Sequence, residues 1–228
     1  MSSADLKTAY ELAAELLLSP DDRDAAKITR LNDEHAHSLP EVAAQISTFL
    51  ASPDSDSVDE YTETLELAPS CPLYLGAHLF DEPSTCNGIG SSGRNPYMLE
   101  MLGIYEHFGL DLAGRELPDF LPVMVEFLAI SLDAQVRDQV GLRRWFLEHH
   151  LQPGLGPLSD SLGKFESPYL HVIAALREAM AEDLRRMGDA PAWQPPDAPA
   201  KSVSLPVLGS NDSPRRGGAR TTVMERCP

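Results

Sequence analysis

The sequence predicts an all-α protein: a single-domain helical bundle followed by a flexible C-terminal tail. In most segments the apolar residues recur every three or four positions, which is the spacing of one face of an α-helix. No segment alternates apolar and polar residues over six positions between turn signals, so strands are not expected. The 228 residues are 43% hydrophobic, which is enough for one substantial core.

Four helical stretches are expected in the first third of the chain. Ser3 caps the first, whose buried face is predicted to contain Leu6, Ala9, Tyr10, Ala13, Leu16 and Leu17. Pro20 opens a second, acidic stretch. The third and fourth are marked by Val42, Ile46, Phe49 and Leu50, then by Val58, Tyr61, Leu65 and Leu67.

Gly88, Gly90 and Gly93 fit G-x-G-x-x-G, the pattern of a dinucleotide-binding loop. That loop requires a strand running directly into the first glycine and a helix that opens within the motif. Here residues 81–87 intervene, and Asn95-Pro96 is the expected helix start, beyond the third glycine. The alternative of a dinucleotide-dependent enzyme is therefore disfavoured, and a Gly/Ser connector between two helices is preferred.

The second half of the chain continues the helical pattern. A helix over 96–108 carries Leu99, Leu102, Tyr105 and Glu106 and ends at Gly109. The stretch 120–132 is apolar almost all round, which predicts the central buried helix. Trp145, Phe146 and His149 extend the next helix, which QPGLGP (152–157) is expected to break. Ser167-Pro168 begins the last helix, with a predicted core face of Ile173, Leu176, Met180, Leu184 and Met187.

Residues 1–187 form the predicted helical domain, and residues 188–228 form a tail rich in Pro, Ala, Ser and Gly that we expect to be mostly disordered. Only SVSLPVL (202–208) is a candidate for docking. The formal net charge is −17. With five Lys/Arg against four Asp/Glu the tail is weakly positive, so the body carries −18. Such a surface should repel nucleic acid and anionic membranes and attract basic peptides, unless it serves only solubility.

The chain shows no signal for export, membrane insertion, metal binding or catalysis. The N-terminus lacks a basic n-region and no apolar run approaches about 20 residues, so a cytoplasmic location is expected. Cys71, Cys86 and Cys227 have no zinc spacing and are expected to be unpaired thiols. The paired histidines point to different faces, and no nucleophile motif or P-loop is present, so we expect neither an enzyme nor a stably bound cofactor.

One carboxylate attracts attention because Glu126 lies within VMVEFLAI, on a helix with no polar face. A buried charge is costly unless it is paired. Glu126 is therefore interpreted either as a structural partner of a neighbouring helix or as a fixed acceptor that shapes a binding groove.

The stretch ELPDFLPVMVEFLA (116–129) resembles the signature of nitrate reductase molybdenum cofactor assembly chaperones of the NarJ type, within the TorD/DmsD group of redox-enzyme chaperones. YTETLEL (61–67), CPLYLGAHLF (71–80) and SSGRNPYMLEML (91–102) resemble other family segments in order and spacing, over about residues 5–185. The wider group often has Asp-His where this chain has Asp119-Phe120, and the connector lacks the usual Gly-Asp. These departures leave the client enzyme open.

The resemblance implies an all-helical TorD/NarJ-type fold that binds the N-terminal segment of a molybdoenzyme catalytic subunit, most nearly the alpha subunit of respiratory nitrate reductase. It implies that the protein holds this apoprotein, as a monomer or weak dimer, while molybdenum–bis(guanine dinucleotide) is inserted. Two alternatives remain: a client elsewhere in the DMSO-reductase superfamily, and a helical adaptor with a lasting partner.

The candidate peptide-binding residues follow from this resemblance and from their apolar, adaptable side chains. They are Tyr74, Met98, Met101, Leu102, Tyr105, Leu117, Pro118, Asp119, Phe120, Met124 and Glu126. Asp119 has two candidate roles, an N-cap of the following helix and a hinge beside the groove. Arg94, in the loop, is a candidate contact for an anionic patch on the client or, as a second possibility, a cofactor phosphate.

Overall fold

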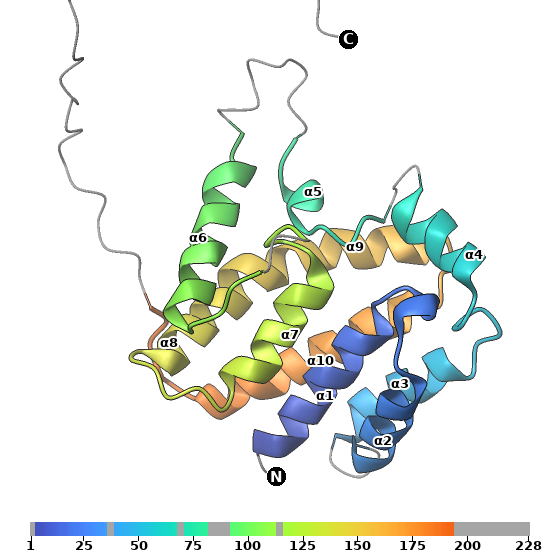
Figure 1. Ribbon diagram of the computed structural model, residues 1–228, viewed down its shortest axis with the longest axis horizontal. Coiled ribbons are helices and arrows are strands. Elements are labelled where there is room, and N and C mark those ends of the chain that lie inside the picture. The colour runs from blue at the N-terminus through green and yellow to red at the C-terminus, as the bar shows by residue number, and fades with distance from the viewer. Residues whose placement is uncertain (1–2, 36–38, 68–70, 82–91, 113–115, 194–228) are drawn as a thin grey trace, which may run out of the picture. The chain divides into compact units, whose positions relative to one another are not determined.

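The computed structural model describes residues 3–35, 39–67, 71–81, 92–112 and 116–193. Within these ranges helix follows helix and no strand forms, which confirms the all-α prediction (Figure 1). A single isolated antiparallel bridge joins Tyr74 to Phe120 in the described chain. The Gly/Ser connector over residues 82–91 and the tail from residue 194 lie outside the described residues.

Helix α1 (Ser3–Leu16) packs against α7 (Leu121–Ser131) on one side and α2 (Ala25–His35) on the other. All the side chains predicted for its core face are buried. The ion pair from Lys7 Nζ to Asp133 (2.5 Å) joins the start of α1 to the chain just beyond the end of α7. The two helices therefore run in opposite directions, as Figure 1 shows.

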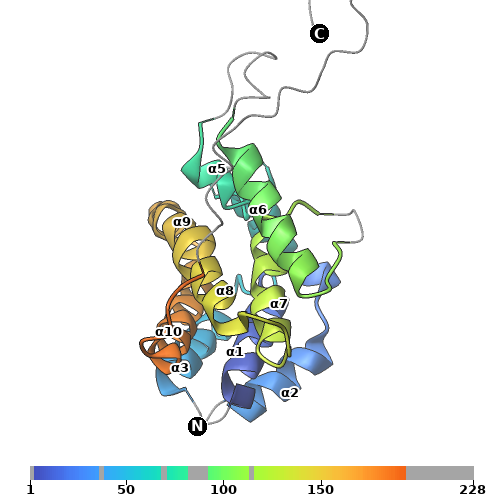
Figure 2. The same ribbon diagram turned by 90° about the vertical axis from the view of Figure 1, so that its left-hand side faces the viewer.

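Helix α10 (Tyr169–Met187) completes the core. It contacts α1, and along its length it packs against α3 (Pro40–Leu50) (Figure 2). The 3-10 turn η1 (Pro20–Asp22) lies between α1 and α2. After α3 come α4 (Val58–Tyr61) and the π-helical η2 (Thr62–Glu66). No helix in the described part of the chain is long and apolar enough to span a lipid bilayer.

Residues 71–81, here called the crossing segment, pass over the start of α7. The segment contains the short helix α5 (Gly76–Leu79). The Leu75 amide donates to the Asp119 carbonyl oxygen (2.9 Å), and the Leu121 amide donates to the Leu73 carbonyl oxygen (2.8 Å). These two hydrogen bonds attach the crossing segment to the residues just before α7.

Helix α6 (Arg94–His107) begins two residues before the predicted Pro96 and buries a different face from the one predicted. Tyr97, Met101, Ile104 and Tyr105 are buried, whereas Leu99 is 67% exposed. The buried face shares Tyr105 with the predicted one and otherwise turns toward Tyr97, and both tyrosine hydroxyls find acceptors there. Tyr97 Oη donates to the His150 carbonyl (2.7 Å), and Tyr105 Oη donates to the Pro118 carbonyl (2.9 Å).

The prediction that QPGLGP ends a helix is wrong. Helix α8 (Gln139–Trp145) continues through the π-helical η4 (Phe146–Leu151) into α9 (Gln152–Lys164), which contains the whole motif. Pro153 lies two residues after the end of the π-helical η4, at the point where the helix passes from π to α geometry. Gly154 packs against Leu75, whose Cβ would lie 3.0 Å from a Cβ at this position. The motif is therefore a packing feature rather than a turn.

Helix α7 is central, as predicted, but it is not buried all round. Val123 is partly exposed, Glu126 is exposed and Ile130 is 43% exposed, so these residues form a narrow stripe that faces solvent. The interpretation of Glu126 as a buried carboxylate is therefore wrong. At the other end of the chain, the Trp193 amide donates to the Gly141 carbonyl (2.9 Å), so the described chain stays packed against α8 beyond residue 187.

Candidate functional site

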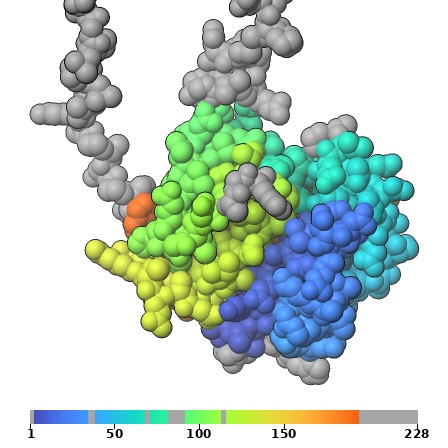
Figure 3. Space-filling model, in the orientation of Figure 1, coloured from blue at the N-terminus to red at the C-terminus, as the bar shows by residue number. Residues whose placement is uncertain are grey.

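A groove of about 460 Å³ lies between α1, α2 and α7. Figures 1 and 3 show these three helices on one face of the helical unit, with α1 between the other two. The apolar surface of the groove consists of Ala14, Leu18, Phe120, Pro122, Val123, Ala129 and Ile130. Its charged surface consists of Glu11, Glu15, Lys27, Arg30, Glu116 and Glu126.

Residues that point away from the core of α1 and α7 form the floor of the groove. Ala14 of α1 and Leu18, two residues beyond the end of α1, are only partly buried, since they lie beside the stripe that packs into the core. On α7 the exposed stripe contributes Val123 and Ile130. Short side chains such as Ala14 let another backbone approach closely, which a docked helix requires.

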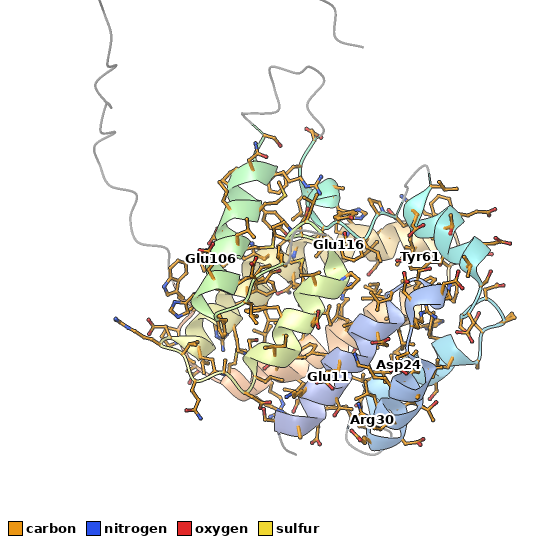
Figure 4. All side chains as sticks on the ribbon, viewed as in Figure 1. Glu11, Asp24, Arg30, Tyr61, Glu106 and Glu116 are labelled. Atoms are coloured by element: carbon orange, nitrogen blue, oxygen red, sulfur yellow. The ribbon has the colours of Figure 1, made fainter. Side chains whose placement is uncertain are left out.

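The carboxylates of the groove exceed the cations that neutralise them. Lys27 pairs with Glu15 (2.7 Å), and Arg30 pairs with Glu34 outside the groove (3.2 Å). In the described chain no ion pair involves Glu11, Glu116 or Glu126; Figure 4 labels the first two. The groove therefore combines an apolar floor with a local excess of negative charge.

An aromatic pair closes the end of the groove near the start of α7. The ring of Phe120 lies against Tyr74 of the crossing segment, with 5.0 Å between ring centroids. Tyr74 Oη donates to Glu116 Oε2 (2.8 Å). Burial, and after it the hydrogen bond and negative charge of Glu116, raise the pKa of Tyr74 to about 12. Tyr74 therefore stays a neutral donor that holds Glu116 at the groove.

Asp119, the residue before Phe120, is completely buried. Its Oδ2 accepts hydrogen bonds from the Gly76 amide (3.1 Å) and from Arg94 Nε (2.9 Å). Its Oδ1 has no hydrogen-bond partner among the described residues. The N-cap of α7 is Phe120, without a side-chain bond, so the predicted capping role of Asp119 is wrong. The aspartate instead joins the crossing segment, the start of α6 and the start of α7.

Arg94 is the first residue of α6 rather than a loop residue. Its Nη2 lies 2.8 Å from Asp119 Oδ2, and its side chain is 26% exposed. Arg94, which was predicted to contact an anionic patch on a client, is therefore already paired with Asp119.

Only two of the predicted peptide-binding residues, Phe120 and Glu126, line the groove. The ring of Tyr74 packs against the ring of Phe120 but does not line the groove. Leu117 is exposed, and Met98 and Leu102 are partly buried on α6; none of the three is part of the groove. The others belong to the buried interior: Met101, Tyr105, Pro118, Asp119 and Met124.

Sequence reasoning missed the wall that α1 and α2 provide. One signal was present, because Ala14 and Leu18 are apolar residues that lie off the predicted core stripe of α1. No sequence signal indicated that Lys27 and Arg30 of α2 would lie beside the same groove.

Comparisons with known proteins agree with this fold. The family model described as nitrate reductase delta subunit matches residues 30–159, more than half of the chain. The chain is 30% identical over 136 residues to the probable nitrate reductase molybdenum cofactor assembly chaperone NarW of Escherichia coli K12, covering 60% of this chain and 52% of that protein. It is 32% identical over 139 residues to the nitrate reductase molybdenum cofactor assembly chaperone NarJ of the same strain, covering 61% of this chain and 51% of NarJ.

The match spans about half the length of these curated relatives. Residues 30–159 include α7 and the whole crossing segment, where the sequence resemblance was strongest, and the matches to NarJ and NarW confirm that resemblance. The chain belongs to the nitrate reductase delta subunit family.

Proposed function

We propose that this protein is a dedicated assembly chaperone that binds the N-terminal segment of a nitrate reductase catalytic subunit in the groove between α1, α2 and α7. The observation that carries the proposal is an apolar groove bounded by carboxylates, three of which (Glu11, Glu116 and Glu126) have no ion-pair partner among the described residues. Membership of the delta subunit family, and the names of its relatives NarJ and NarW, support the choice of client. In this proposal the protein binds the catalytic subunit in the cytoplasm, before that subunit is assembled into the nitrate reductase.

An amphipathic helix suits this groove better than an extended strand, because no sheet edge is available in the described chain. The apolar face of the helix packs on Ala14, Val123 and Ile130. The surrounding carboxylates attract basic residues and hasten encounter, and salt weakens this effect. A chaperone must release its client, so we expect affinities from micromolar to high nanomolar, roughly −8 to −10 kcal/mol.

The protein itself makes and breaks no bonds in this proposal. The molybdenum–bis(guanine dinucleotide) cofactor is cargo of the client, and the chaperone keeps the client open for its insertion. The role is thus that of a non-catalytic assembly factor, in keeping with the names of the relatives.

Capture of the client from cells tests the proposal. Tagged protein should recover the cofactor-free catalytic subunit from anaerobically grown cells that express it. Ile130→Lys places a charge on the groove floor and should reduce recovery about tenfold. Phe165→Lys is the matched control, because Phe165 is 55% exposed and lies outside the groove.

Equal recovery with Ile130→Lys and Phe165→Lys would show that the groove is not the binding site. Recovery of a cofactor-loaded subunit in a lasting complex would indicate an adaptor instead. Loss of capture when the N-terminal segment of the client is deleted is the third expected result.

A further inference from the structure

We infer that the groove fixes the direction in which a helix binds, because the carboxylates of its α7 wall have no ion-pair partner among the described residues, whereas its α2 wall holds an exposed arginine that can change its partner. The inference rests on the proposed function, since it specifies the helix that the groove accepts. The accepted helix has an apolar stripe, a basic flank that faces α7 and an acidic flank that faces α2.

The order of the helices separates the charges. Helix α1 contacts both α7 and α2 and therefore lies between them. On the α7 side, the groove is lined by the carboxylates Glu116 and Glu126 and by no cation. On the α2 side it is lined by two cations, Lys27 and Arg30, and by Glu15 of α1, which pairs with Lys27. Figure 4 shows Arg30 and Glu116 at well-separated places on this face.

The ion pairs of the cations differ in strength. Lys27 is held by Glu15, whose side chain is only 8% exposed, so this pair is a fixed part of the wall. Arg30 and Glu34 are both more than half exposed and are four residues apart on one helix. Exposed pairs of this kind contribute little to stability. Arg30 is therefore available to exchange Glu34 for a carboxylate on a bound helix.

A helix that lies with its apolar stripe on the groove floor presents one flank to each wall. When the helix is turned end for end, its two flanks exchange walls. A helix with one basic and one acidic flank therefore has one favourable direction, in which basic residues meet Glu116 and Glu126 and acidic residues meet Arg30. In the opposite direction acidic residues meet Glu116 and Glu126, and basic residues meet a wall whose carboxylates are already paired.

The charges that line the groove and the net charge of the whole chain predict different preferred ligands. The net charge of −17 favours a helix that is basic on both flanks. The walls favour the mixed helix, because a basic flank beside Lys27 and Arg30 finds only carboxylates that are already paired, whereas an acidic flank can pair with Arg30. At 0.15 M salt the Debye length is about 8 Å, so contacts in the groove outweigh the distant charges.

Three synthetic stapled helices with the same apolar stripe test the inference: mixed, basic on both flanks, and acidic on both flanks. By titration calorimetry the mixed helix should bind about threefold to tenfold more tightly than the doubly basic one. Arg30→Gln should remove most of this preference. Arg177→Gln is the matched control, because Arg177 is exposed on α10 and outside the groove.

A photo-crosslinker at the peptide N-terminus tests the direction itself. The mixed helix and a helix with exchanged flanks should label opposite ends of the groove, one near Phe120 and the other near Ile130. Labelling of the same end by both helices, or tightest binding by the doubly basic helix, would overturn the inference.

Failure of the inference differs from failure of the proposed function. If all three helices bind equally and Ile130→Lys abolishes their binding, the groove binds helices but does not select direction. If Ile130→Lys leaves the binding of every helix unchanged, the groove is not the site and the proposed function itself is wrong.

Discussion

In the described part of the chain two Arg–Asp pairs have a buried aspartate, one in the core and one beside the groove. In the core, Arg143 pairs with Asp183, and both side chains are less than 5% exposed. Tyr10 Oη also donates to Asp183 (2.9 Å), and Arg143 Nη1 donates to the Leu128 carbonyl (2.7 Å). Beside the groove, Arg94 is 26% exposed and Asp119 keeps one oxygen without a partner among the described residues.

The difference indicates two uses of the same two residue types. The core pair joins α1, α7, α8 and α10, and it has no buried atom without a partner in the described chain. Breaking such a pair leaves an uncompensated buried charge. The pair beside the groove has exposed surface and an unused acceptor, so it can rearrange at lower cost. The core pair should therefore determine stability, and the pair beside the groove should influence binding.

Breaking the core pair should give the largest effect on stability. Arg143→Met leaves Asp183 buried without its cation and should lower the free energy of unfolding by about 3–5 kcal/mol. Urea denaturation measures this loss. The double variant Arg143→Met/Asp183→Leu should recover part of it, because no charge then remains buried.

Binding of a client peptide by the remaining folded fraction of Arg143→Met should keep its normal affinity, since Arg143 does not line the groove. A large loss of affinity in the folded fraction would remove the contrast between the two pairs.

A third buried group, His150, lies away from the groove and has fewer hydrogen bonds than the core pair. Both of its ring nitrogens are buried without a hydrogen-bond partner in the described chain. Burial lowers the pKa of His150 to about 4, against the opposing effect of Glu100, whose Oε1 lies 3.7 Å away. Between pH 6.5 and 4 the unfolded chain thus binds a proton that the folded protein excludes.

Stability should therefore be fully present above pH 6.5 and fall by about 3 kcal/mol as the pH drops to 4. Urea denaturation across this range measures the decline. His150→Gln should flatten it. An equally steep decline in the variant would assign the acid sensitivity to other groups.

Gly76→Ala disturbs the pair beside the groove without removing either partner. The new Cβ would lie 2.4 Å from Asp119 Oδ2 and 2.7 Å from Arg94 Nε, so the pair must shift. We expect a stability loss of about 1–3 kcal/mol and a severalfold loss of peptide affinity, because Phe120 follows Asp119 directly. Thermal denaturation and calorimetry measure the two effects.

Gly103→Ala is the matched control, because no neighbouring atom lies within 4 Å of a Cβ there. It should raise stability by about 0.5–1 kcal/mol through helix propensity and leave affinity unchanged. If Gly76→Ala also leaves affinity unchanged, the Arg94–Asp119 pair supports only the fold.

Periodicity predicted the fold well where one apolar stripe dominates a helix, as it does in α1. It succeeded only in part for α6, where the predicted face and the buried face share Tyr105 and the hydrogen bond of Tyr97 to the His150 carbonyl favours burial of the Tyr97 side. It failed at 152–157, because Pro and Gly are usual helix breakers and only the contact between Gly154 and Leu75 explains their place in α9.

The site was less predictable than the fold, because it is formed by helices that are far apart in the sequence. Glu126 was found for the wrong reason, since it was expected to be buried and is exposed. The contacts of Asp119 with Gly76 and Arg94 could not be predicted from its place before an apolar helix, where an N-cap is the usual role.

Methyl NMR of the protein with the N-terminal peptide of a nitrate reductase catalytic subunit is the most direct test of the groove. The account predicts chemical-shift changes for the methyl groups of Leu18, Val123 and Ile130, which line the groove. It predicts no change for Leu99, which is 67% exposed on α6. Changes at Leu99 and Leu102 without changes at Val123 and Ile130 would contradict it and place the client on α6.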